Sequence, residues 1–271
     1  EGMRFTIQVS QFDCTSCGSC ADVCPANALV MEPVKLTEAS RELWEYGLGL
    51  TDKGSVFDPY TVKGSQFKQP LLEFSAACAG CGETPYAKLL TQLFGDRVYW
   101  ANATGCSQAW GSPFPGIPYT TNKRGFGPAW TNSLFENNAE LSLGLYLGST
   151  QQRAAEKARV EKLVKVLACG LENLKEDKGD TPDPAVMGQV KAVCESYLAA
   201  FDDFDASRAS SDALVGAIEA SMGSLTNSAK KVCEGILKFK DQLAKKTFWM
   251  FGGDGWAYDI GFGGLDHVVA S

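Results

Sequence analysis

The sequence predicts an α/β fold, in which a parallel-sheet domain with a helical insertion follows a cysteine-rich segment. Strand-like runs at Val98–Ala101 and Thr247–Phe251 each lead into a glycine-containing loop. Between them, apolar residues recur with helical periodicity through residues 151–246. Seven of the ten cysteines lie at or before Cys106. Strands that alternate with helices favour a parallel sheet, which binds its ligand at the carboxyl ends of the strands.

The composition divides the chain into three predicted parts. Residues 1–32 hold the densest run of cysteines. Residues 33–72 form a connector that is rich in glycine and proline and lacks a long periodic pattern. Residues 73–271 form the α/β domain, which contains the helical block at 151–246 and is expected to be truncated at its C-terminus.

Four apolar stripes predict about four helices in the helical block, and Pro184 after Asp183 marks the first turn of the second helix. The stripes consist of Val160, Leu163, Val164, Leu167, Leu171 and Leu174, of Met187, Val190, Cys194, Tyr197 and Phe201, of Leu214, Ile218, Met222 and Leu225, and of Val232, Ile236, Phe239 and Leu243. Each stripe is expected to face the buried core of the block.

Charge and cysteine content argue against several classes of protein. The 271 residues carry 25 basic and 32 acidic side chains, a formal charge of −7, which disfavours a nucleic-acid-binding face. No apolar run approaches the roughly 18 residues of a membrane span, and no charged start leads into an apolar signal segment. The single histidine, His267, excludes a zinc site with several histidines. Clustered cysteines in such a chain predict metal ligation in a reducing cytoplasm.

The first cysteine group has the spacing of an iron–sulfur site. Cys14, Cys17, Cys20 and Cys24, followed by proline, match the C-x2-C-x2-C-x3-C-P run that binds [4Fe–4S] clusters. The first three thiolates would bind one cluster, and Cys24 would ligate its neighbour, as in the second half of a bacterial-type 2[4Fe–4S] ferredoxin-like domain. The remaining ligands are expected upstream. A zinc knuckle is the alternative, but zinc sites rarely carry a third cysteine in this rhythm.

A second group supplies three more thiolates, from Cys78, Cys81 and Cys106. We expect a further iron–sulfur cluster here, with a fourth ligand beyond Ser271. A redox-active pair and buried structural cysteines are the alternatives. Three cysteines of the helical block are expected to be ordinary buried or half-buried thiols: Cys169, Cys194 and Cys233.

A glycine-rich loop, Gly252–Trp256, follows the second strand-like run. Its Asp254 lies between Gly253 and Gly255, and a carboxylate repels a diphosphate unless a divalent cation lies between them. The loop therefore predicts metal-bridged diphosphate binding, as in thiamine-diphosphate enzymes, with Asp254 on Mg²⁺ and glycines that permit close backbone approach. An ordinary tight turn capped by the aspartate is the alternative.

Five motifs carry a resemblance to a known family. They are C-T-S-C-G-S-C-A-D-V-C-P (14–25), A-A-C-A-G-C-G-E-T-P-Y (76–86), N-A-T-G-C-S (102–107), Y-T-T-N-K-R-G-F-G-P-A-W (119–130) and G-G-D-G-W-A-Y-D-I-G-F-G-G-L-D-H-V (252–268). Together they resemble pyruvate:ferredoxin (flavodoxin) oxidoreductase over nearly the whole chain, least specifically in the helical block. The resemblance covers the end of that enzyme's ferredoxin-like domain and most of its second thiamine-diphosphate domain.

The resemblance implies a reaction and its cofactors. It implies oxidative decarboxylation of pyruvate with coenzyme A to acetyl-CoA and CO2, with electrons passing through [4Fe–4S] clusters to ferredoxin or flavodoxin. It also implies up to three clusters in the full enzyme, thiamine diphosphate, Mg²⁺ and a homodimer. No catalytic residue is assigned to this chain, which by itself is expected to be inactive.

The resemblance also assigns site residues by motif. The cluster bound by Cys78, Cys81 and Cys106 would lie nearest the thiamine cofactor. Asp254 would bind Mg²⁺. The cofactor itself would contact Glu83, Cys106, Gly253, Asp254, Gly255 and Trp256.

Three other functions stay open from the residues alone. The same machinery could act on another 2-oxoacid, because the specificity residues lie outside the chain. A thiamine-free iron–sulfur electron-transfer module would use only the cysteines. A zinc-stabilised structural module would use the same thiolates without redox chemistry.

Overall fold

A computed structural model describes residues 7–35, 37–50, 56–112, 116–134, 137–172, 182–257 and 264–271. The chain forms two compact units. The first, here called the cysteine unit, consists of Glu1–Val98, Asn102–Glu136 and Phe251–Phe262. The second, here called the helical unit, consists of Tyr99–Ala101, Asn137–Met250 and Gly263–Ser271. Each unit is described by itself.

A small parallel sheet has the strand order β2-β1-β3. Its strands are β1 (Val98–Asn102), β2 (Ala129–Thr131) and β3 (Thr247–Phe251). Both strands predicted from the sequence are confirmed, and together with the surrounding helices they confirm the α/β class. The backbone N–H of Ala103 donates to Phe251 O at 2.8 Å. The loops that follow β1 and β3 therefore begin side by side.

The cysteine unit contains short helices joined by long loops. These are α1 (Ser19–Asp22), α2 (Glu38–Gly49), α3 (Val62–Ser65), α4 (Thr84–Phe94), α5 (Cys106–Gly111) and α10 (Asp254–Ala257). Helix α2 lies in the predicted connector, where the sequence shows no long periodic pattern. The Thr37 side chain caps it by accepting from Ser40 N, and α2 buries none of its residues. The half-buried residues of α2 are Ser40, Trp44 and Gly47. Because Trp44 is the only large apolar side chain among them, this face leaves no long apolar period in the sequence.

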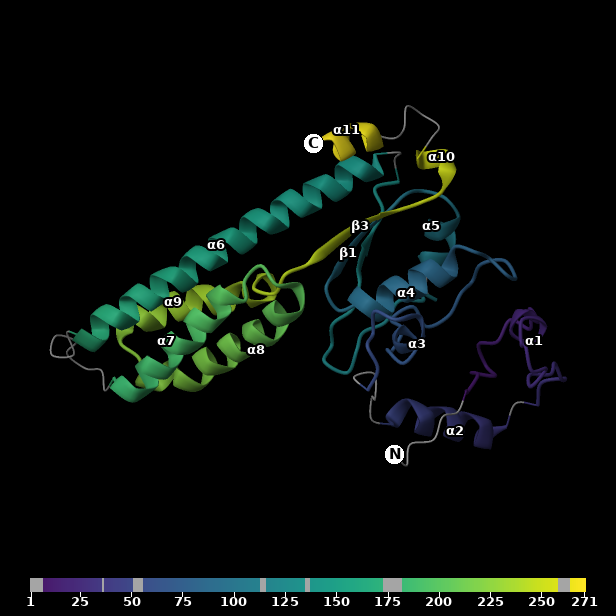
Figure 1. Cartoon of the computed structure of the whole chain (residues 1–271), viewed down its shortest axis with the longest axis horizontal. Helices are drawn as coiled ribbons and strands as arrows, with labels where there is room; N and C mark the ends of the chain where they lie inside the picture. Colours follow the sequence, from purple (N-terminus) through teal and green to yellow (C-terminus); the bar gives the residue numbers. More distant parts are fainter. Residues whose placement is uncertain are drawn as a thin grey trace. The chain divides into compact units, whose positions relative to one another are not determined.

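The helical unit has four long helices: α6 (Asn138–Glu172), α7 (Pro184–Ala199), α8 (Phe204–Ser221) and α9 (Asn227–Lys238). Helix α6 packs against α7 and α9, and α8 packs against α7 (Figure 1). Helix α6 begins at Asn138 rather than near residue 151. The short elements of this unit are η1 (Met222–Ser224), η2 (Lys240–Gln242) and α11 (Leu265–Ala270).

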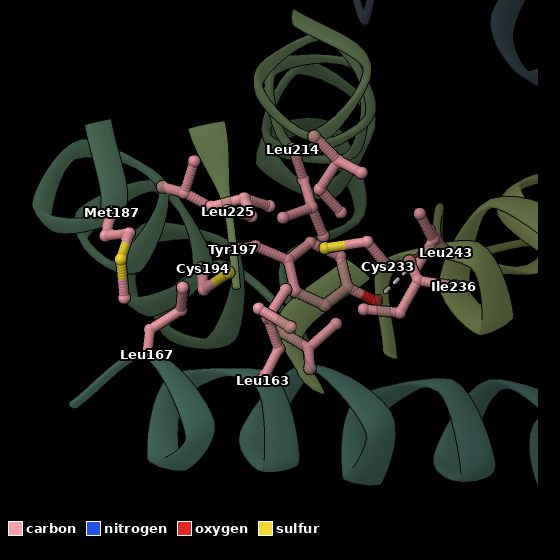
Figure 2. Packing of buried hydrophobic residues seen from close by; sticks show 14 of the residues in the cluster. Leu163, Leu167, Met187, Cys194, Tyr197, Leu214, Leu225, Cys233, Ile236 and Leu243 are labelled. Carbon is pink, nitrogen blue, oxygen red and sulfur yellow. Dashed lines mark hydrogen bonds between the residues drawn. The ribbon is translucent and has the colours of Figure 1, made fainter. Parts of the chain in front are cut away.

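Side chains from all four long helices form the core of the helical unit (Figure 2). At its centre Tyr197 is fully buried, and its hydroxyl donates to Leu243 O at 3.1 Å. The pKa of this phenol is raised to about 12, because burial disfavours the charged form. The buried core residues are Val160, Leu163, Leu167, Met187, Val190, Cys194, Tyr197, Phe201, Leu214, Ile218, Leu225, Ala229, Cys233, Ile236 and Leu243.

The apolar stripes faced the core as predicted at most positions. Pro184 occupies the first turn of α7, as predicted. The Asp183 side chain caps this helix by accepting hydrogen bonds from the backbone N–H groups of Ala185 and Val186. The prediction was wrong for Phe239, which is 40% exposed. Because α9 ends at Lys238, helical spacing no longer keeps Phe239 on the buried face. Leu174 lies outside the described residues.

Within the described residues, no helix combines the length and the apolar character that crossing a bilayer requires.

Candidate iron–sulfur and cofactor site

The first cysteine group lies on a loop that turns sharply around Cys17 and on the short helix α1, which contains Cys20. Cys14, Cys17 and Cys20 are exposed and Cys24 is half-buried. Ser16 and Gly18 on either side of Cys17 have φ values of 57° and 79°. Left-handed backbone at alternate positions reverses the chain direction, which a short loop needs in order to present successive thiols to one ligand.

Hydrogen bonds in this loop favour thiolate. Cys17 Sγ lies 3.5 Å from Ser19 Oγ, and this hydrogen bond lowers the pKa of Cys17. The backbone N–H of Ala28 donates to Cys24 Sγ at 3.3 Å and lowers the pKa of Cys24. The thiolate is the form of cysteine that binds metal. The local structure therefore suits metal ligation.

The second group occupies two loops of the cysteine unit. Cys78 and Cys81 enclose a turn in which Cys81 N donates to Cys78 O at 3.1 Å, and Gly80 in this turn has φ 67°. A Cβ atom on Gly80 would lie 3.7 Å from Ser19 Oγ, so this turn lies beside the first cysteine group. Cys106 is exposed and begins α5, directly after the β1 loop.

The donor set fits a [4Fe–4S] cluster, because thiolates are the ligands of such clusters. All seven of these cysteines are outside disulfides. Among the described residues, no three His, Cys, Asp or Glu side chains lie close enough together to hold a metal ion. Metal binding is often coupled to local folding, because a preformed site is rare before the metal binds. The assignment of individual cysteines to clusters therefore stays a prediction.

The three cysteines of the helical unit differ from expectation at one position. Cys194 and Cys233 are fully buried, as predicted, and burial raises their pKa values to about 12 and about 11. Cys169 is exposed, so the prediction that it is buried or half-buried was wrong. It lies two residues after the buried Leu167 on α6, which turns it by about 200° away from the core.

The glycine-rich loop is crowded at its start and open further on. A Cβ atom on Gly252 would lie 2.6 Å from Ala103 Cβ and 3.0 Å from the Trp256 ring, so only glycine fits there. Nothing lies within 4 Å of the corresponding positions on Gly253 and Gly255. This room would allow a diphosphate to approach the backbone, and in this respect the loop fits thiamine diphosphate.

Part of the predicted loop cannot be assessed. The Asp254 side chain and residues 258–263 of the longer motif lie outside the described residues. Asp254 as the Mg²⁺ ligand therefore stays a prediction. Trp256 is buried, and its Nε1 has no hydrogen-bond partner among the described residues.

Glu83 has a partner that sequence analysis missed. It lies at the start of α4, half-buried, and its Oε2 accepts from Trp110 Nε1 at 3.1 Å. Tyr119 also lies close to Glu83. The pKa of Tyr119 is raised first by burial and then by the charge of Glu83. No sequence signal links Glu83 to Trp110, because the contact joins residues 27 positions apart.

Comparison with known proteins first defines a class. Residues 7–30 match the family described as a 4Fe-4S binding domain. This match covers Cys14, Cys17, Cys20 and Cys24, and it supports [4Fe–4S] clusters as cofactors.

Similarity to much longer proteins covers the whole chain. The chain is 48% identical over 273 residues to pyruvate:ferredoxin oxidoreductase of Moorella thermoacetica and equally identical to pyruvate-flavodoxin oxidoreductase of Enterobacter agglomerans. It covers 22% of each, and all of this chain is matched. Pyruvate dehydrogenase [NADP(+)] of Cryptosporidium parvum is 43% identical, over 98% of this chain and 14% of that protein. The chain is thus homologous to a segment of pyruvate:ferredoxin and pyruvate-flavodoxin oxidoreductases and spans about a fifth of their length, as its motifs predicted.

Proposed function

We propose that the chain is the iron–sulfur and thiamine-diphosphate-binding portion of an enzyme that oxidises pyruvate. With coenzyme A, that enzyme would form acetyl-CoA and CO2 and pass the electrons to ferredoxin or flavodoxin. One structural observation carries the proposal. The loop that leads to Cys106 and the Gly252–Trp256 loop begin side by side, joined through Ala103 N and Phe251 O. The names of the relatives support the same reading.

The cysteines would hold the electron-transfer chain. Cys14, Cys17 and Cys20 would bind one [4Fe–4S] cluster, and Cys24 would ligate a neighbouring cluster of the ferredoxin-like domain. The second cysteine group, of Cys78, Cys81 and Cys106, would bind a third. The closeness of Gly80 to Ser19 supports electron transfer between the two groups, because it brings their loops together.

The residues near the glycine-rich loop would hold the cofactor. Thiamine diphosphate, when bound, supplies the chemistry that cleaves the bond between the two carbonyl carbons of a 2-oxoacid. Gly253 and Gly255 would let the backbone approach its diphosphate, and Asp254 would bind the bridging Mg²⁺. Glu83 would contact the cofactor through the carboxylate oxygen that Trp110 does not occupy. A homodimer is part of the proposal because thiamine cofactors usually lie between two domains or subunits.

The test uses the complete polypeptide that carries this chain, purified without oxygen. We expect bound iron and acid-labile sulfide, and reduction of ferredoxin or flavodoxin only when pyruvate and coenzyme A are both present. Asp254→Ala is expected to lose thiamine diphosphate, because the metal bridge is lost, and to keep its iron. Cys194→Ala is the matched control and should keep both.

Three outcomes would contradict the proposal. Iron with no thiamine binding in the parent protein would indicate a thiamine-free electron-transfer module. Zinc in place of iron would indicate a structural module. Loss of iron from the Asp254→Ala variant would show that the glycine-rich loop serves the clusters instead of a diphosphate.

A further inference from the structure

We propose that Trp110 is a positioning residue, whose indole N–H fixes the Glu83 carboxylate so that its second oxygen is presented to the cofactor. Trp110 has no place in the motif-based assignment, and this inference rests on the proposed function. It also links two parts of the site, because Trp110 and Cys106 lie on the same short helix.

The hydrogen bond itself is the first observation. Trp110 is 3% exposed, and its Nε1 donates to Glu83 Oε2 at 3.1 Å. Among the described residues no donor reaches the other oxygen, Oε1. A donor that engages one oxygen of a carboxylate restricts the rotation of the group. The remaining oxygen then keeps a fixed direction before any ligand binds.

Two further aromatic side chains, Tyr119 and Trp130, lie next to α5. A Cβ atom on Gly111 would lie 3.5 Å from Tyr119 Oη and 3.6 Å from Trp130 Nε1, so both polar atoms lie beside α5. The rings of Tyr119 and Trp130 stack with their centroids 6.5 Å apart. Burial and the Glu83 charge keep the Tyr119 phenol protonated, so it does not add a second negative charge here.

Helix α5 connects this arrangement to the second cysteine group. Cys106 is its first residue, and Trp110 follows four positions later, on the same face. About one helical turn separates the two residues. If a cluster fixes Cys106, it also fixes the indole that orients Glu83. The geometry thus couples cluster binding to the direction of a cofactor-contacting carboxylate.

Matched variants of the complete, cluster-loaded polypeptide test this role. We expect Trp110→Phe, which keeps an aromatic ring and loses the donor, to bind thiamine diphosphate about tenfold more weakly by calorimetric titration. Its iron content and the electron paramagnetic resonance spectra of its clusters should not change. Trp130→Phe is the control. Trp130 Nε1 is buried and has no partner among the described residues, so thiamine affinity should change by less than about twofold.

A double-mutant cycle separates positioning from packing. In a Glu83→Ala background, Trp110→Phe should cause no further loss of thiamine affinity, because there is no carboxylate left to orient. Equal losses in both backgrounds, or unchanged affinity in Trp110→Phe alone, would overturn the inference and leave the proposed function intact. A parent protein that binds no thiamine diphosphate would overturn both. If Trp110→Phe loses iron, Trp110→Leu, which also lacks the donor, takes its place in the cycle.

Discussion

Cysteines in the two units of the molecule have opposite environments. In the cysteine unit, Cys17 and Cys24 lie on loops, and hydrogen bonds to sulfur lower their pKa values. In the helical unit, Cys194 and Cys233 are fully buried among apolar side chains, and burial raises their pKa values to about 12 and about 11. The environment, and not the residue type, decides which thiols are available as metal ligands.

The same contrast extends to how each unit is stabilised. The helical unit has one continuous core, to which each of its long helices contributes buried side chains. In the cysteine unit, α1 and α2 bury none of their residues. Apolar side chains such as Phe12, Val30 and Tyr46 are exposed there. The core of the helical unit thus consists of side chains from its own helices, whereas the helices next to the first cysteine group have no buried residue.

Chemical reactivity should show the largest difference between the two classes of cysteine. In the folded, iron-free protein at neutral pH, we expect iodoacetamide to modify Cys17 and Cys24 at least about 1,000-fold faster than Cys194. A pKa of about 12 leaves Cys194 with about a thousandth of the thiolate of an ordinary cysteine, and burial adds to this. Peptide mass spectrometry measures each site. In concentrated denaturant the three cysteines should react with iodoacetamide at similar rates. If Cys194 still reacted about 1,000-fold more slowly there, its local sequence and not its burial would explain the difference.

Core packing should show the next largest effect. Leu163→Ala on α6 is expected to lower the free energy of unfolding of the helical unit by about 2–5 kcal/mol, because Leu163 is fully buried. Leu147→Ala on the same helix is the control, since Leu147 is 48% exposed, and it should cost under about 0.5 kcal/mol. Urea unfolding followed by circular dichroism measures both. Iron content should be the same in both variants, and a loss of iron in Leu163→Ala alone would show that the clusters depend on this core.

Much of the helical unit could be predicted because burial along a helix is a local pattern. Residues such as Leu163, Leu167 and Tyr197 repeat at helical spacing, so each stripe marks its own buried face. The same period places Cys169 opposite Leu167, which explains its exposure once the buried face is known. Helix α2 has no fully buried residue, and Trp44 is the only large apolar side chain on its half-buried face, so the sequence shows no long apolar stripe there.

The candidate site also has features that the local sequence shows and features that depend on how separate helices pack. The spacing of the proposed cluster ligands from Cys14 to Cys24 is visible in the sequence, because these cysteines are near neighbours along the chain. The contact between Glu83 and Trp110 joins two separate helices and depends on how α4 and α5 pack. Tryptophan in a helix is usually a packing residue, so nothing in the sequence marks Trp110 as a partner of a carboxylate.

Ionisation of the two buried thiols should destabilise the helical unit at alkaline pH, and this effect is the smallest of the three predicted here. Their pKa values in the folded protein, about 12 for Cys194 and about 11 for Cys233, exceed that of an ordinary thiol near 9. The folded state therefore holds protons that the unfolded state releases, so this stabilisation is complete below about pH 8 and is lost between pH 9 and 12. At pH 10 the helical unit should be less stable than at pH 8 by about 2–3 kcal/mol.

The matched variant for this measurement removes both thiols. Cys194→Ala combined with Cys233→Ala lowers stability at every pH, because it leaves a cavity in the core. In this variant the loss of stability between pH 8 and pH 10 should be smaller, because only the other titratable groups still contribute to it. Tyr197 has a pKa raised to about 12 in the same core, and an ordinary phenol titrates near 10, so most of its contribution is lost above this window. An unchanged difference in the double variant would show that the buried thiols do not set the alkaline limit of the unit.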